Sequence, residues 1–198
     1  MIKNVIFDIG NVLLDFCWKD HIARFGFQGE KADRIAQAMM LGPIWPKLDL
    51  GLESDEDILE QFVAHTPELE QEIRLVFSDL STIVREYEGS VDWIESLKAR
   101  GYHTYYLSNY GERIRREASK ELSFLPHMDG GIMSYTVHLA KPDPAIYQTL
   151  LDRYGLKAEE CVFLDDTVRN VEAAQALGIA GIVVTSQEQA KKELETLL

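Results

Sequence analysis

The sequence predicts an α/β protein, built as a doubly wound parallel sheet with a helical cap subdomain inserted after the first strand. In the second half of the chain, apolar strand candidates alternate with helical segments, a pattern typical of parallel sheets. One earlier strand candidate stands alone at residues 4–8, and an almost wholly helical block separates it from the others. We therefore expect a core formed by residues 1–15 and 87–198 and a cap formed by residues 16–86.

The first strand and the helical block are predicted from apolar spacing. The run before Asp8 is continuously apolar, which is typical of a buried strand. In the block, "EKADRIAQAMML" and "PELEQEIRLVFSDLSTIVREY" have helical spacing, and Ser54 with Asp57 resembles a capping box. The stretch "GPIWPKLDLG" has two prolines and two glycines, so we expect turns there. No second strand is expected before residue 102.

The second half alternates regularly between the two kinds of element. Glycines or polar residues close most of its segments, as expected at element ends. The predicted order is helix 90–100, strand 103–109, helix 111–121, strand 130–135, helix 144–155, strand 161–166, helix 169–178, strand 179–185 and a C-terminal helix.

Composition excludes several classes of protein. The 198-residue chain is 46% hydrophobic, enough for a sizeable core, and its net charge is −13, without the basic stripe that nucleic-acid binding needs. Cys17 and Cys161 lie far apart and are expected to be reduced structural thiols. No apolar run is long enough to span a membrane, and the N-terminus is a poor signal peptide. We expect a cytoplasmic protein that binds neither nucleic acid nor membrane; its oligomeric state is unknown from the sequence.

Polar residues end three of the predicted strands. These are Asp8, the pair Ser108 and Asn109, and the pair Asp165 and Asp166. In open α/β sheets, ligands bind at the carboxyl ends of the strands, so we expect these residues at one edge. A carboxylate such as Asp8 can attack phosphorus and form a covalent intermediate. The adjacent acids offer oxygen ligands for a hard cation such as Mg²⁺.

Four motifs occur in order with suitable gaps: "FDIGNVL", "LSN", "AKPDPAIY" and "FLDDTVRNVEAAQALGI". Together they resemble the motifs of the haloacid dehalogenase-like (HAD) hydrolases. The most similar branch is that of helical-cap sugar-phosphate phosphatases with a DxGNV motif, and the phosphatase domain of soluble epoxide hydrolase is also similar. The resemblance implies a HAD-like Rossmannoid core with strand order 5-4-1-2-3, which places the first strand in the centre.

The resemblance also implies a metal site and a nucleophile. Asp8 would carry an aspartyl-phosphate and ligate one Mg²⁺ together with Asp166 and the carbonyl of Gly10. Asp165 would help from nearby. Asn170, four residues after Asp166, would hold the metal carboxylates in place, or would simply cap a helix.

Two further motifs would bind the phosphate. Lys141 would pair with the phosphate and with Asp8. Ser108 and the backbone amide of Asn109 are expected where a helix begins, and free amides there favour an anion. In the cap, Trp45 would pack on a sugar face of the substrate or anchor the cap core. In the core, Tyr110, which follows "LSN", would also line the pocket.

The first motif departs from the family pattern at Gly10. HAD phosphatases usually have a second aspartate there, which protonates the leaving group and then activates water. General acid–base help of this kind is worth about 10²- to 10⁴-fold in rate. Asp15, Asp20 and His21 are candidate substitutes, although each also fits a hinge or surface role. Gly10 would need a positive φ if it forms a tight turn.

The sequence thus predicts a magnesium-dependent phosphatase that hydrolyses a small phosphorylated metabolite, a sugar phosphate in particular, through Asp8. Three alternatives stay open. Gly10 is compatible with a catalytically weak phosphate-binding or regulatory protein. A 2-haloacid dehalogenase would need no metal, so the pair of Asp165 and Asp166 argues against it. A signalling receiver domain would be much shorter, with its acid pair near the N-terminus.

Overall fold

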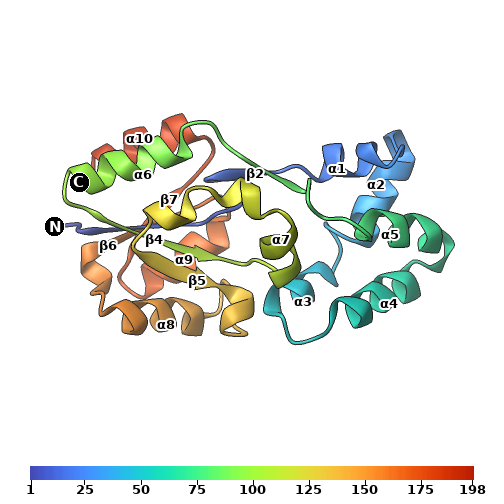
Figure 1. Ribbon diagram of the computed structural model, residues 1–198. Coiled ribbons are helices and arrows are strands. Elements are labelled where there is room, and N and C mark those ends of the chain that lie inside the picture. The colour runs from blue at the N-terminus through green and yellow to red at the C-terminus, as the bar shows by residue number, and fades with distance from the viewer.

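The computed structural model describes residues 1–198 and contains a five-stranded parallel sheet (Figure 1). Its order is β5-β4-β1-β6-β7, so β1 lies in the centre, as predicted. Register pairs the last residue of β1 with Tyr106 on one side and Leu164 on the other. The carboxyl ends of three neighbouring strands therefore meet at one edge. The strands are β1 (Asn4–Phe7), β4 (His103–Ser108), β5 (Gly130–Met133), β6 (Cys161–Asp165) and β7 (Ala180–Val183).

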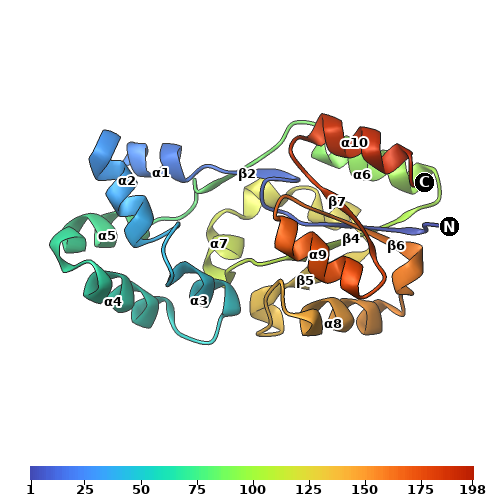
Figure 2. The same ribbon diagram turned by 180° about the vertical axis from the view of Figure 1, so that it is seen from behind.

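Helices cover both faces of this sheet (Figures 1 and 2). Val5 and Phe7 point to the side of α6 and α10, whereas Ile6 points to the side of α8 and α9. Both faces of β1 are thus buried, which explains its continuous apolar run. The core helices are α6 (Ser90–Ala99), α7 (Glu112–Glu117), α8 (Pro144–Tyr154), α9 (Val168–Ala176) and α10 (Gln187–Glu195). The predicted helix 111–121 ends early as α7 and continues as a 3₁₀ turn, Ser119–Leu122.

The cap is a group of helices that lies beside the sheet, beyond the carboxyl ends of its strands (Figure 1). The N-cap of the expected capping box is confirmed, because the Ser54 hydroxyl accepts a hydrogen bond from the Asp57 amide at 3.1 Å; the Asp57 carboxylate accepts from the same hydroxyl at 2.7 Å. No helix of the protein has the length and apolar character required to cross a membrane. The cap helices are α1 (Trp18–Arg24), α2 (Gly29–Ala38), α3 (Trp45–Leu50), α4 (Asp55–His65) and α5 (Glu70–Phe77).

Two predictions about the cap are wrong. Strands β2 (Leu14–Phe16) and β3 (Val84–Glu86) pair antiparallel where the chain enters and leaves the cap. The helix expected to reach residue 86 ends at Phe77, and the Asp79 carboxylate then accepts the Ser81 amide in a turn. Three-residue strands are too short to show alternation, and their pairing depends on a partner about 70 residues away. The predicted division of core and cap falls within β2 and at the end of β3, and that division stays a prediction.

The stretch "GPIWPKLDLG" also differs from the prediction, because it contains helix α3. Pro46 lies in the first turn, where a backbone donor is not needed. Gly51 ends the helix in the left-handed conformation, with a φ of 62°. The two residue types that suggested turns therefore delimit a short helix, which lies between the rest of the cap and α7 (Figure 1).

Candidate active site

Asp8 lies at the carboxyl end of the central strand. Its backbone amide donates to the carbonyl of Leu164 at 2.7 Å, so the sheet ladder holds the residue in place. Its side chain is only 11% exposed, and Oδ1 lies 2.9 Å from Nζ of Lys141. The ion pair with Lys141 thus offsets the free-energy cost of burying this carboxylate.

Lys141 is the centre of a buried charge cluster. Its ammonium group lies between Asp8 Oδ1 at 2.9 Å and Asp165 Oδ2 at 2.6 Å, and its side chain is 1% exposed. Burial lowers the pKa of Lys141, but the two carboxylates outweigh it, so the pKa is raised and the group stays protonated. Burial raises the pKa of Asp8 to about 7; Lys141 lowers it and Asp165 raises it.

Asp165 is fully buried and its oxygens are occupied by protein donors. Besides Lys141, it accepts from Nδ2 of Asn170 at 3.0 and 3.1 Å and from the amide of Thr167 at 2.8 Å. Asn170 lies inside α9, whose N-cap is Thr167, so the helix-cap alternative for Asn170 is wrong. The amide of Asn170 instead holds Asp165, which in turn orients the lysine.

Asp166 has a different environment, because its carboxylate faces the cavity. It accepts from Nδ2 of Asn11 at 2.8 Å and from the Thr167 hydroxyl at 3.3 Å. Asn11, which has a φ of 55°, links the loop after β1 to the loop after β6. The sequence marked this residue only as part of a turn. The φ of Gly10 is not positive, contrary to the strain considered for that position.

These carboxylates form a set of donors that fits a divalent cation. One oxygen each from Asp8, Asp165 and Asp166 lie within 4.8 Å of one another, and Gly10 lines the same cavity. Hard oxygen donors of this kind are the ligands that Mg²⁺ prefers. Because Asp165 is held by several protein donors, Asp8 and Asp166 are the better-placed direct ligands.

Ser108 ends β4 and Asn109 follows it, beside the central strand, as predicted. Ser108 is buried, and its hydrogen bond to Asp8 lowers the pKa of that carboxyl, against the effect of burial. The side chain of Asn109 makes two hydrogen bonds with the backbone of Lys141, at 2.8 and 3.0 Å. The next helix begins only at Glu112, so the expected helix N-terminus at Ser108 is wrong. The amide of Asn109 belongs to a loop.

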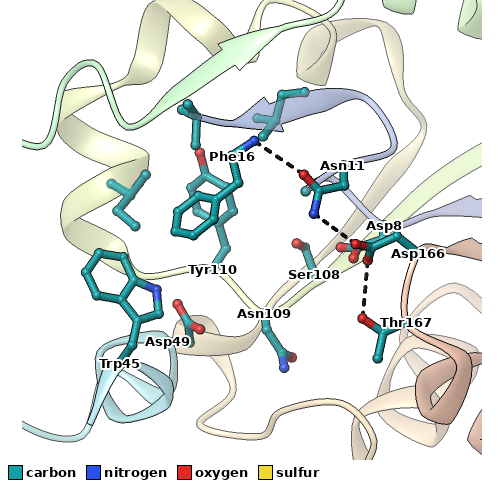
Figure 3. Close-up of a pocket in the computed structure, with 14 residues that line it drawn as sticks. Asp8, Asn11, Phe16, Trp45, Asp49, Ser108, Asn109, Tyr110, Asp166 and Thr167 are labelled. Atoms are coloured by element: carbon teal, nitrogen blue, oxygen red, sulfur yellow. Dashed lines mark hydrogen bonds between the residues drawn. The ribbon is translucent and has the colours of Figure 1, made fainter. Parts of the chain in front are cut away.

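A cavity of about 240 Å³ opens above Asp8 (Figure 3). Its polar residues come mostly from the strand ends, and the wall opposite them is apolar. Trp45 packs against Phe62 in the cap, as expected of a cap anchor, and it also lines the cavity; its contact with a sugar face stays a prediction. Tyr110 lines it as predicted. The apolar wall consists of Leu14, Phe16, Trp45, Val84, Tyr110 and Ile114.

None of the three candidate substitutes for the missing acid lines this cavity. Asp15 accepts from the Cys17 thiol at 3.2 Å, and Asp20 pairs with Arg85 at 3.3 Å on the surface. His21 is fully buried in the cap, where Nδ1 lies 3.0 Å from the Thr82 hydroxyl. A carboxylate that the sequence did not mark, Asp49 of α3, does line the cavity (Figure 3).

Comparison with known proteins agrees with this geometry. Residues 2–178 match the family described as haloacid dehalogenase-like hydrolase. The chain belongs to this family. The predicted resemblance is therefore confirmed, and the HAD fold accounts for the sheet order and for the cap inserted after β1.

Individual relatives fall into two groups. The chain is 32% identical to "Acyl-CoA dehydrogenase family member 10" of Mus musculus over 99% of its own length, and 36% identical to "Bifunctional epoxide hydrolase 2" of Sus scrofa over 50%. It spans only 19% of the length of each. By contrast, the "Sesquiterpene phosphatase astK" of Aspergillus oryzae is 25% identical, with 99% of this chain and 96% of that protein aligned.

A solved structure shares the whole fold. It is a HAD family enzyme of Bacteroides thetaiotaomicron in complex with magnesium and inorganic phosphate. The TM-score is 0.72 at 22% identity, and the match covers 94% of this chain and 96% of that one.

Proposed function

We propose that this HAD hydrolase is a magnesium-dependent phosphatase that acts on a small phosphate monoester through an aspartyl-phosphate on Asp8. The observation that carries the proposal is the buried ion cluster of Asp8, Lys141 and Asp165, next to the cavity-facing carboxylate of Asp166. The phosphatase among the relatives and the magnesium–phosphate complex of the structural neighbour support it.

The chain's own residues divide the work. Asp8 supplies the oxygen that attacks phosphorus. Lys141, held by Asp165 and by Asn109, keeps a positive charge beside the nucleophile and beside the place of the phosphoryl oxygens. Ser108 donates to the same region. Positioning and charge neutralisation of this kind provide most of the catalysis in phosphoryl transfer.

A magnesium ion would be held by Asp8, Asp166 and the carbonyl of Gly10. When bound, it neutralises charge on the phosphate dianion and on the two carboxylates. Asn11 and Thr167 hold Asp166 toward the cavity, and Asn170 holds Asp165 with Lys141. These side chains keep the two adjacent acids apart in function: Asp166 would ligate the metal, and Asp165 orients Lys141.

The shape and lining of the cavity also limit which alcohol can be the leaving group of the substrate. Its apolar wall provides contact area for a carbon skeleton, and Trp45 offers an aromatic face to a sugar ring. A sugar phosphate therefore stays the proposed substrate, bound by its less polar face. The small volume favours a single ring or a short chain over a nucleotide.

Phosphate release from a panel of phosphorylated sugars and short alcohols tests this proposal, with and without magnesium. We expect turnover that requires the metal and that falls to background in the Asp8→Asn variant. Phosphate binding without turnover would instead favour the regulatory alternative. Halide release from a 2-haloacid without metal would favour a dehalogenase.

A further inference from the structure

The cavity lacks a general acid on its core side. Gly10 has no side chain, and a Cβ placed there would meet nothing within 4 Å. Three carboxylates line the cavity: Asp8, Asp166 and Asp49. The first two are the proposed nucleophile and metal ligand. Asp49 comes from the cap and has no role in the chemistry described above.

The carboxylate of Asp49 lies at the wall of the cavity, and the residue is half-buried. No protein group donates a hydrogen bond to it, and Asp8 and Lys141 are the charged groups whose fields reach it. In the close-up, it lies between Trp45 and Asn109 and points to the cavity (Figure 3). A carboxylate that lines the cavity and accepts no hydrogen bond from the protein is available to a ligand bound there.

Backbone contacts fix the helix that carries Asp49 to the core. The hydroxyl of Ser134 donates to the carbonyl of Asp49 and accepts from the amide of Tyr110 at 2.9 Å. Nδ1 of His138 lies 2.9 Å from the carbonyl of Leu50. The loops after β4 and β5 thus hold α3 in one position over the site.

Two glycines allow this close approach. A Cβ at Gly51 would lie 2.9 Å from Cβ of Tyr135, and a Cβ at Gly111 would lie 3.1 Å from Cγ of Leu48. The first glycine is on the cap side and the second on the core side. The seam between α3 and the core is therefore packed tightly enough to define where the carboxylate points.

We propose that Asp49 is the general acid and base of the reaction, supplied by the cap in place of the aspartate that Gly10 replaces. This inference rests on the proposed phosphatase function. It assigns to the cap a part of the chemistry in addition to substrate selection.

One carboxyl group can supply and then recover the proton that the two steps of hydrolysis require. In the first, an oxygen of Asp8 bonds to phosphorus, the bond from phosphorus to the ester oxygen breaks, and that oxygen takes the proton of Asp49. In the second, Asp49 takes a proton from water, the water oxygen bonds to phosphorus, and the aspartyl-phosphate bond breaks. Asp8 is then free, inorganic phosphate leaves, and Asp49 is protonated again.

The environment of Asp49 suits both steps. The pKa of its carboxyl is raised to about 7, because desolvation and the nearby charge of Asp8 raise it and together outweigh the lowering effect of Lys141. A group that titrates near the working pH can give a proton in one step and accept one in the next. An exposed aspartate, with a pKa near 4, would be a poor acid at neutral pH.

Leaving-group dependence distinguishes this role from a structural one. The substrates are 4-nitrophenyl phosphate, whose leaving group needs no proton, and glycerol 3-phosphate, whose leaving group does. In the Asp49→Asn variant we expect kcat/KM to fall about 10²- to 10⁴-fold for the alkyl ester and only a few-fold for the aryl ester. Because water activation is also lost, kcat for the aryl ester should fall, with a burst of one nitrophenol per active site.

Two further variants complete the test. Asp20→Asn makes the same change on the surface and should leave both esters unaffected. Gly10→Asp, which has room for a side chain, should restore at least tenfold of the alkyl-ester rate in the Asp49→Asn background. In the Asp49→Asn variant, the inhibition constant of inorganic phosphate should stay within about twofold of the native value, which would verify that the phosphate site is intact.

Equal losses for both esters, or no loss, in Asp49→Asn would overturn the assignment while native hydrolysis still supports the phosphatase. A native protein that cleaves the aryl ester alone would overturn it as well, because a working general acid should support both. Absence of native turnover on either ester and on the metabolite panel would contradict the proposed function, and the inference with it.

Discussion

Lys141→Met is expected to destabilise the protein strongly and in a pH-dependent way. The change keeps an unbranched side chain but removes a charge that lies 2.6 Å from Asp165 and 2.9 Å from Asp8. Breaking a buried ion pair by removing one partner costs about 3–5 kcal/mol, because the remaining charge is uncompensated. Domains of this size are stable by about 5–15 kcal/mol, so the variant should still fold.

The sign of the pH dependence follows from the carboxylates. In the native protein the pKa of Asp8 is already raised to about 7, and loss of the lysine raises it further. Above about pH 7 the folded variant therefore keeps a proton that the folded native protein has lost, which adds about 1.4 kcal/mol to the deficit for every further pH unit. The deficit should be largest at pH 8, should shrink as the pH falls to about 6 and should change little below that.

Urea unfolding of the metal-free protein at pH 8, 6 and 5 measures this. Lys31→Met is the matched control, since Lys31 pairs with Glu72 with half of its side chain exposed. The control should lose less than about 1 kcal/mol. A Lys141→Met deficit equal to that of the control, or one that does not change with pH, would refute the account of the buried cluster.

Three other changes test separate parts of the structure. Asp166→Ala should abolish magnesium binding in calorimetric titration without unfolding the protein; unchanged affinity would rule out the metal assignment. Asn170→Ala removes both hydrogen bonds to buried Asp165 and should lower the free energy of unfolding by about 1–3 kcal/mol, whereas a neutral result in urea would contradict the positioning role. Gly51→Ala should cost more than Gly155→Ala in thermal unfolding, because the two share a φ near 62° but only Gly51 packs against the core; equal costs would argue against the tight seam.

The sequence predicted the core of this protein well, for a physical reason. Parallel strands end at a common edge, so polar residues after separate apolar runs had to converge once the alternation was recognised. Asp8, Ser108 and Asp165 were therefore found without any knowledge of their contacts. The pairing of Lys141 with Asp8 was expected instead from the resemblance to the HAD hydrolases, and in the structure the two charged groups lie 2.9 Å apart.

The cap was less predictable because its structure depends on long-range pairing. Strands β2 and β3 are three residues each, and each is stabilised by the other across the whole cap sequence. Asp49 looks like any surface acid in "KLDLG"; only the docking of α3 on Ser134 places it at the cavity. The left-handed Gly51 two residues later was the one local signal that a helix ends there.

Trapping of the covalent intermediate tests the central claim most directly. The native protein, mixed with magnesium and substrate, is quenched with borohydride, which reduces an acyl phosphate to an alcohol, and the digested peptides are analysed by mass spectrometry. We predict that Asp8 is converted to homoserine in a substrate-dependent manner and that no other aspartate is. Modification of Asp166 or Asp49, or substrate turnover with Asp8 unmodified, would contradict the account.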